Sequence, residues 1–340
     1  MDKNKWLRFG VGIIVLFLFG VFLKLAKAIL VPFAMALLFG FAVSPALNFL
    51  VRRKVPKSVA LAIILIFSFA VLYLIGMVFF SSGKTLADEL PSYTEMVQSF
   101  LERIDRLVPD PRLRLGLAEW VQGFNVGRIG AFLLSALGPF LSFMSDLLLV
   151  FIFMIFILGG RGRLTRKMDE AFESGPASAM SRTAVRIDCE VQRYLAVKTL
   201  VNVLIGLLVA AILAVCGVRF AVLFGVVAVL FNYIPSLGAL ASIALPSIMT
   251  LFVDAGFTFR VGLVLVLLTG IHVALLRFVQ PRLMGKEHSL SPLLVLFSLF
   301  FWAWLWGLPG MILAVPLLTA ARIIFENVPS LRFLATMMDR

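Results

Sequence analysis

Long apolar runs dominate this chain, and polar and helix-breaking residues interrupt one of them in its middle. The run from about 220 to 253 carries a central group of such residues, namely Asn232, Pro235, Ser236, Gly238 and Ser242. Proline removes a backbone donor and glycine tolerates conformations that other residues avoid, so we expect a helix here to break near Pro235. In lipid, freed backbone groups need partners from protein or from water in a cavity, so such a break usually lines a path.

A second apolar run, from about 290 to 325, has the same character. It contains Trp306-Gly307-Leu308-Pro309-Gly310, followed by Pro316. Two apolar segments that Gly and Pro interrupt in corresponding positions are typical of the binding site of a transporter. The pattern therefore points to a transport core built from broken helices.

The uninterrupted apolar runs are about 20 residues long, which is the length of a membrane-spanning helix. Together the runs predict an all-α polytopic membrane protein with about six full spans and two broken re-entrant hairpins, hence about eight membrane segments. An inverted repeat is one arrangement that this pattern allows. The full spans are expected at about 9–23, 28–50, 58–80, 132–158, 199–215 and 261–276.

Two polar stretches separate these spans. Residues 81–130 predict an extracytoplasmic helical insertion, with a new helix capped at Ser92 after Pro91, and packing against the spans is its simplest role. Residues 161–198 predict amphipathic helices in the cytoplasmic interface. The predicted segments are 1–80 (N-terminal spans), 81–130, 131–160 (a span), 161–198, 199–326 (the broken-helix transport core) and 327–340 (a cytoplasmic tail).

Composition agrees with this reading. The chain is 61% hydrophobic and 14% charged, with a mean hydropathy of +1.06, whereas soluble domains average about 25% charged residues. The net charge of +13 comes from basic residues at loop edges, which fits the positive-inside rule rather than nucleic-acid binding. The two cysteines, Cys189 and Cys216, suggest neither a metal site nor a disulfide framework.

Charge bias also orients the chain. Basic residues near the N-terminus and at 52–57 place both in the cytoplasm, and both termini are expected there. The run 220–253 would then enter from outside and return, so that Arg277 and Arg282 fall in the cytoplasm. The second run would enter from the cytoplasm and return there. Two full crossings for each run would preserve the same charge sides.

The hairpin tips offer uncharged polar chemistry. Asn232, Ser236 and Ser242, carbonyls freed by the prolines, and the nearby His272 and Gln280 could hold a small polar solute or a cation without a carboxylate. For Asn232 and the serines, helix packing and capping is the competing interpretation, and His272 could be a packed polar residue. Asp146, within an apolar run, is the ion-coupling candidate; it could instead cap a helix at the membrane interface.

Six motifs carry a resemblance to a known family. They are Val191-Gln192-Arg193-Tyr194-Leu195, Cys216-Gly217-Val218, Asn232 to Gly238, Gln280 to Gly285, Leu290-Ser291-Pro292, and Trp306 to Gly310 with Ala314-Val315-Pro316. In this order and spacing the chain resembles the autoinducer-2 exporter family of bacterial inner-membrane proteins, also called the permease family of PerM type.

The resemblance implies export or exchange of a small solute by elevator-like movement, in a homo-oligomer of five subunits. Members of the family are linked to a furanosyl signalling molecule used in quorum sensing, and others to sodium/proton exchange. Substrate binding is then expected at the two broken segments and at the Gln280 motif, which adds Pro281, Pro309 and Gly310 to the residues above.

The leading hypothesis is therefore a secondary transporter for a small polar solute, with Na⁺ or H⁺ as coupling ion and membrane lipid as its surroundings. A sodium/proton antiporter that uses Asp146 is the first alternative, and a structural membrane scaffold is another. An intramembrane enzyme would need a nucleophile with a base, or paired carboxylates, at membrane depth. Because the sequence offers neither, we expect no enzymatic activity, and no cofactor or metal.

Overall fold

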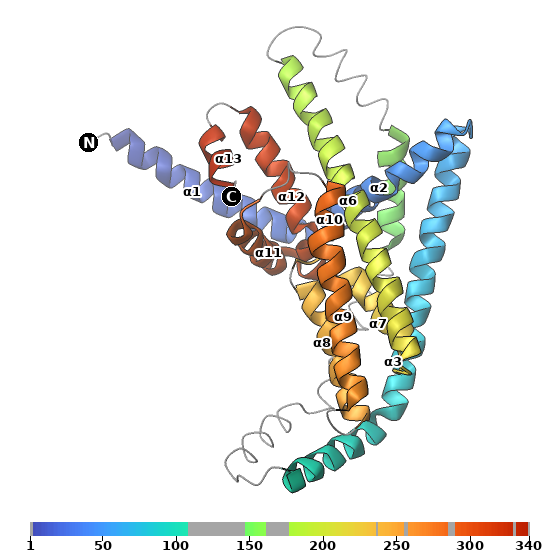
Figure 1. Ribbon diagram of the computed structural model, residues 1–340. Helices are drawn as coiled ribbons and strands as arrows, with labels where there is room; N and C mark the ends of the chain where they lie inside the picture. The colour runs from blue at the N-terminus through green and yellow to red at the C-terminus, as the bar shows by residue number, and fades with distance from the viewer. Residues whose placement is uncertain are drawn as a thin grey trace. The chain divides into compact units, whose positions relative to one another are not determined.

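The computed structural model describes residues 3–107, 147–160, 177–235, 237–254, 258–284, 290–328 and 331–338. The elements assigned in these ranges are helices (Figure 1), which confirms the predicted all-α class. In the described residues, five helices are long and apolar enough to cross a membrane, and shorter apolar helices accompany them. The chain is a multi-pass membrane protein. The five long segments are 27–52, 57–85, 185–215, 259–284 and 308–327.

The N-terminal helices are α1 (Lys3–Leu25), α2 (Lys27–Arg52) and α3 (Lys57–Leu107). The expected new helix at Ser92 is wrong, because α3 continues through Pro91 as one helix. A proline inside a helix removes one backbone hydrogen bond and bends the helix without always ending it. The bend of α3 is visible in its C-terminal part (Figure 1).

Helix α6 (Ala177–Val215) joins two segments that the sequence divided at Lys198. The backbone is helical across the expected boundary between an interfacial helix and a span. No proline lies between the two ends of α6, and Gly206 is tolerated in its interior. The amphipathic N-terminal part and the apolar C-terminal part therefore belong to one continuous helix.

Both predicted breaks are confirmed. The first separates α7 (Ala221–Phe231) from α8 (Leu237–Val253), and the second separates α11 (Pro292–Trp306) from α12 (Leu308–Asn327). In each case the two helices pack against each other as a hairpin. The second break is at Gly307, whose φ of +68° is a conformation that glycine adopts without the Cβ penalty.

The chain forms two compact units. Unit 1 comprises residues 1–65, 146–196 and 286–340, and unit 2 comprises 66–145 and 197–285. Each unit therefore contains one of the two hairpins: α11 and α12 lie in unit 1, and α7 and α8 lie in unit 2.

Unit 1 is held by packing and by polar contacts between distant segments. Leu158, in the helix from Leu147 to Gly160, lies against Gly40 of α2, and the indole Nε1 of Trp306 donates to the carbonyl of Leu23 at 3.1 Å. Near the end of α12, Glu326 forms ion pairs with Arg186 and with Arg322, each at 3.1 Å. The last helix, α13 (Arg332–Met338), packs against α12.

Unit 2 has an apolar core to which α6, α7 and α9 (Phe259–Val273) contribute. Glycines allow α6 and α7 to cross closely: a Cβ at Gly206 would collide with the side chain of Val229 and with the carbonyl of Gly225. Small residues at such a crossing let membrane helices bring their backbones together. The buried members of the core are Val201, Ile205, Val209, Leu213, Val218, Ala228, Val264 and Leu268.

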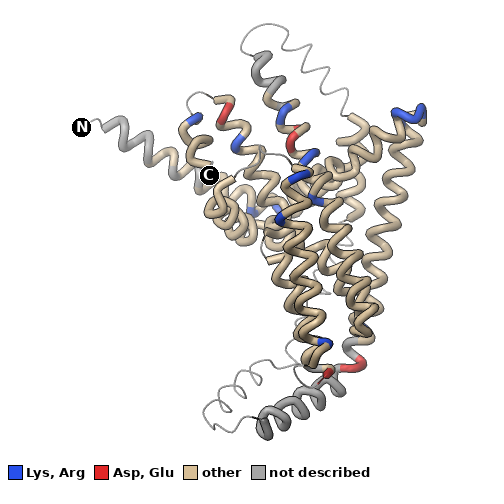
Figure 2. The backbone as a smooth tube through the Cα atoms, in the orientation of Figure 1, with Lys and Arg blue, Asp and Glu red and all other residues tan. Residues whose placement is uncertain are grey.

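Helix α9 continues into a π-helical segment, η1 (Ala274–Val279), and then into α10 (Gln280–Met284). The widened turn lies directly before Pro281, which has no N–H to donate and would clash with the preceding turn of a regular helix. In this unit, α7 and α8 carry no Lys, Arg, Asp or Glu, and Figure 2 shows them drawn without blue or red.

Candidate functional site

Three of the predicted site residues meet in unit 2. The amide nitrogen of Asn232 donates to the hydroxyl of Ser242 at 3.0 Å and lies 3.5 Å from Nε2 of His272. It also donates to the carbonyl of Ala228 at 2.7 Å, at the C-terminal end of α7. All three side chains are at most 3% exposed. The cluster joins the first break to both α8 and α9.

Two further polar atoms of this cluster are bonded to their own helices. The Ser242 hydroxyl donates to the carbonyl of Gly238 at 2.7 Å, and Nδ1 of His272 lies 2.8 Å from the carbonyl of Leu268. Buried polar groups require such partners, since an unsatisfied one costs about 1–3 kcal/mol. The network is therefore a preorganised set of uncharged hydrogen-bonding groups.

Helix α6 holds Tyr233, the residue that follows Asn232, through hydrogen bonds. The phenol oxygen of Tyr233 is 2.7 Å from the hydroxyl of Thr199. With its amide oriented so that both ends find partners, buried Asn202 accepts from the backbone N–H of Tyr233 and donates to the carbonyl of Lys198, each at 3.2 Å. The break is thus held from two sides, by α6 and by α8.

Gly238 lies inside α8, and its role differs from the expected one. Its backbone is not among the positive-φ glycines of the described residues, so the fold does not use its conformational freedom. A Cβ there would collide with the backbone of Phe231 and Asn232. Gly310 has the corresponding position in the other hairpin, where a Cβ would collide with the carbonyl of Trp302. Each hairpin therefore needs a glycine for close approach.

Proline inside α8 removes one helical hydrogen bond close to the cluster in sequence. Pro246 has no N–H, so the carbonyl of Ser242 cannot receive the usual helical bond from the fourth residue onward. One turn later, the hydroxyl of Thr250 donates to the carbonyl of Pro246 at 2.7 Å. The carbonyl of Ser242 therefore lacks its usual helical donor.

The other predicted residues of unit 2 are not part of this cluster. Pro235 is half-buried in the turn between α7 and α8, and Ser236 lies outside the described residues. Gln280 and Pro281 lie on α10, about 12 Å along the helix from His272 at about 1.5 Å per residue. The amide nitrogen of Gln280 is 3.7 Å from the sulfur of Met284, and its buried oxygen has no hydrogen-bond partner among the described residues.

The remaining predicted residues belong to unit 1. Pro309 is in the first turn of α12, where a missing N–H costs no helical bond, and the buried Gly310 follows it. Asp146 lies outside the described residues, so its predicted coupling role remains a prediction.

Sequence reasoning missed Lys198. Its side chain is 6% exposed within α6, although the sequence suggested the polar end of an interfacial helix. Buried ionisable residues are rare and usually functional in membrane spans. The signal was present, because Lys198 is followed by an apolar stretch and lies one helical turn before Asn202.

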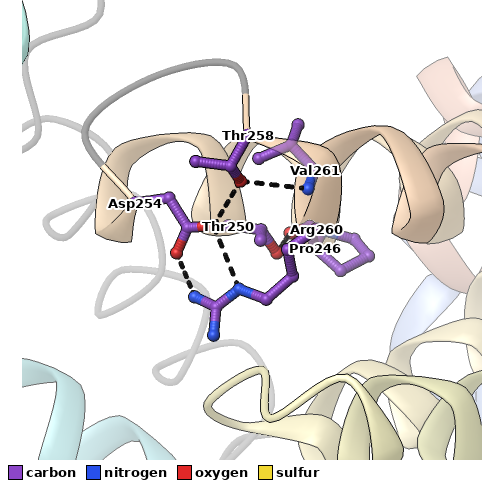
Figure 3. Close-up of polar contacts among 6 residues, drawn as sticks. All are labelled: Pro246, Thr250, Asp254, Thr258, Arg260 and Val261. Atoms are coloured by element: carbon purple, nitrogen blue, oxygen red, sulfur yellow. Dashed lines mark hydrogen bonds and ion pairs between the residues drawn. The ribbon is translucent and has the colours of Figure 1, made fainter.

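At the corner between α8 and α9, an acid and a base form an ion pair (Figure 3). The guanidinium of Arg260 contacts both carboxylate oxygens of Asp254, with Nε 3.0 Å from Oδ2. Thr258 donates its hydroxyl to Asp254 at 2.6 Å and accepts from the backbone N–H of Val261, so it caps α9. This corner fixes where α8 ends and α9 begins.

Among the described residues, no group of three His, Cys, Asp or Glu side chains is placed to hold a metal ion. The Asn232–Ser242–His272 cluster provides amide, hydroxyl and imidazole groups. Such groups can exchange hydrogen bonds with the hydroxyl and carbonyl groups of a neutral solute.

Comparisons with known proteins identify the family of this chain. The model of the AI-2E family of transporters matches residues 12–330. A protein of Borreliella burgdorferi named "Putative transport protein" is 30% identical over 94% of this chain and 87% of its own length. The AI-2 transport protein TqsA of Escherichia coli is 29% identical over 96% and 94%. A sodium-lithium/proton antiporter of Halobacillus andaensis is 23% identical over 94% of each chain. The chain belongs to the AI-2E family of membrane transporters.

Proposed function

We propose that this transporter moves a small, neutral, polyhydroxylated solute and binds it at the Asn232–Ser242–His272 cluster. The observation that carries the proposal is the buried Asn232 amide, which joins three helical segments at a helix break. Helices α7 and α8 carry no ionisable side chain, so the site favours an uncharged ligand over a carboxylate-bound cation. The relative TqsA is named as an AI-2 transport protein, so autoinducer-2 is the first solute to test.

Alternating access is the mechanism that we propose. Each compact unit contains one helix hairpin broken by Gly or Pro, which is typical of secondary transporters. No P-loop motif occurs in the sequence, so the driving force is expected to be a solute or ion gradient rather than nucleotide hydrolysis by this chain.

The test is counterflow of labelled autoinducer-2 into proteoliposomes that contain the purified protein. We expect Asn232→Ala and Ser242→Ala to weaken apparent solute affinity. Loss of a buried hydrogen-bonding group costs about 1–3 kcal/mol, which corresponds to about fivefold to about a hundredfold in affinity. Thr250→Val is the matched control, because it removes a buried hydroxyl bonded to a carbonyl in the same way, about two turns along α8.

Counterflow that is equally fast with Asn232→Ala and with the wild type would place solute binding elsewhere. Equal losses for Ser242→Ala and Thr250→Val would mean that the effect is one of folding. A protein that shows no counterflow of autoinducer-2 in any form would contradict the proposed solute class.

A second candidate function is sodium/proton exchange, and the observation in its favour is the similarity to the Halobacillus andaensis antiporter. The same proteoliposomes test it with labelled sodium under an imposed pH gradient. Asp146→Asn should abolish sodium flux and leave autoinducer-2 counterflow intact if the chain is an antiporter. Absence of sodium flux in the wild type would eliminate this candidate.

A further inference from the structure

We propose that His272 binds the proton that drives transport, and that the Asn232 amide conveys its protonation to the break between α7 and α8. This inference rests on the proposed function, because it assigns the coupling ion to the proposed solute site. The ligand is a proton taken up from water on one side of the membrane and released to water on the other. The imidazole of His272 becomes imidazolium in between.

The hydrogen bonds define the tautomer of His272. The Leu268 carbonyl, 2.8 Å from Nδ1, can only accept, so Nδ1 carries the hydrogen. In neutral imidazole Nε2 is then an acceptor, and it faces the amide nitrogen of Asn232 at 3.5 Å. That nitrogen is a donor, as its shorter bond to the Ala228 carbonyl requires. His272 is then neutral, and its Nε2 lone pair lies 3.5 Å from an amide nitrogen whose two hydrogens are donated to Ala228 and Ser242.

A proton on Nε2 would conflict with this arrangement. Two donors would then face each other across 3.5 Å, without an acceptor between them. Turning the Asn232 amide would present its oxygen to Nε2–H and remove the conflict. The same turn would place that oxygen against the Ala228 carbonyl and would break the bond to Ser242. Protonation therefore exchanges bonds to α7 and α8 for one bond to α9.

The location of Asn232 makes this exchange matter for the fold. Helix α7 ends at Phe231, and Asn232 is its C-cap. Asn232 is therefore the first residue of the break between α7 and α8. Releasing its bond to Ala228 frees the end of α7 from its own side-chain cap. The structural element that responds to the proton is the same one that presents the proposed solute site.

Few other charged groups lie on the elements of unit 2 around His272. In unit 2, α6 contributes Lys198, the turn contributes the phenol of Tyr233, and α7 and α8 contribute none. In the continuous helical segment that contains His272, Arg260 lies at the start of α9 and Arg277 lies in η1. No carboxylate occurs on these elements between Val197 and Val253, so no acid there can replace His272 as the proton carrier.

The first test reads the imidazole directly. The sequence has two histidines, so ¹⁵N-histidine labelling of the His288→Gln variant leaves His272 as the single labelled ring. In nanodiscs at high pH, we expect the nitrogen shifts of an Nδ1–H tautomer. Lowering the pH through the range from about 8 to about 5, where histidine normally titrates, should convert them to imidazolium shifts, and adding autoinducer-2 should move the midpoint. The opposite tautomer, or a ring that never titrates, would overturn the proposal.

The second test separates coupling from binding. In proteoliposomes, a pH gradient should drive autoinducer-2 accumulation by the wild type and by His288→Gln. His272→Gln retains a side-chain acceptor for Asn232 but cannot titrate. Because His272 also belongs to the proposed binding cluster, the readout is the ratio of gradient-driven accumulation to counterflow in the same proteoliposomes, which we expect the pH gradient to raise for the wild type and not for His272→Gln. If His272→Gln still accumulates solute under the gradient, the proton site is elsewhere. If the wild type shows no counterflow at all, the proposed function fails instead.

Discussion

At the scale of single residues, two glycines determine whether the hairpins can close. We predict that Gly238→Ala destabilises the protein by about 1–3 kcal/mol, the usual cost of overpacking. The added methyl group would meet the backbone of Phe231 and Asn232, which cannot move aside as a flexible side chain can. Thermal unfolding in detergent, followed by the loss of monodisperse protein, measures the effect.

Gly262 provides the matched control for this prediction. It is also a helical glycine in unit 2, but a Cβ there meets nothing within 4 Å. Gly262→Ala should be neutral or should stabilise α9 by about 0.5–1 kcal/mol, since alanine favours the helix more than glycine does. Equal stabilities of the two variants would show that the close approach at Gly238 is unimportant.

At the scale of elements, the corner between α8 and α9 should depend on its ion pair. The Asp254 carboxylate is 12% exposed and is paired with Arg260, so Arg260→Gln leaves a mostly buried charge with weaker partners. We predict a loss of about 1.5–3 kcal/mol, typical for a hydrogen bond to a charged group. Hydrogen exchange in the first turn of α9, together with thermal unfolding, measures it.

The ion pair of Arg219 with Glu89 is the comparison for Arg260. Its side chains are 55% and 32% exposed, and exposed pairs contribute about 0–1 kcal/mol. Arg219→Gln should therefore change stability little, and its small effect should disappear at high salt. If Arg219→Gln lost more stability than Arg260→Gln, the Arg219–Glu89 ion pair would be the stronger of the two, contrary to this prediction.

The elements also show how far sequence reasoning extends. Local chemistry predicts the breaks near Pro235 and Pro309, because a missing N–H and a flexible glycine act within one turn. The continuity of α6 across Lys198 and of α3 across Pro91 was missed, since polarity and proline make helix ends favourable without requiring them. Asn232, Ser242 and His272 were each named from sequence, but their meeting depends on the packing of α7, α8 and α9, which periodicity alone does not encode.

At the scale of the whole molecule, the first hairpin determines the sidedness of unit 2. Helix α7 has 11 residues and α8 has 17. At about 1.5 Å per residue they are about 16 and about 26 Å long, less than the hydrocarbon thickness of about 30 Å. The hairpin begins and ends at the same end of the unit, because a Cβ at Gly217 would lie 3.8 Å from the guanidinium of Arg260. We propose that this end faces outward and that the opposite end of α9 is cytoplasmic.

Single cysteines in a Cys189→Ala, Cys216→Ala background test this orientation with a membrane-impermeant thiol reagent on spheroplasts. Val215 and Phe259 are 89% and 87% exposed and flank the hairpin on either side. We expect Val215→Cys and Phe259→Cys to react in intact spheroplasts and Arg282→Cys to react only after lysis, because α9 and η1 carry the chain across the bilayer between Phe259 and Arg282. Labelling of Val215→Cys and Phe259→Cys from opposite sides would contradict the hairpin. Labelling of Arg282→Cys alone in intact cells would invert the whole unit, and proton uptake at His272 would then begin from the other compartment.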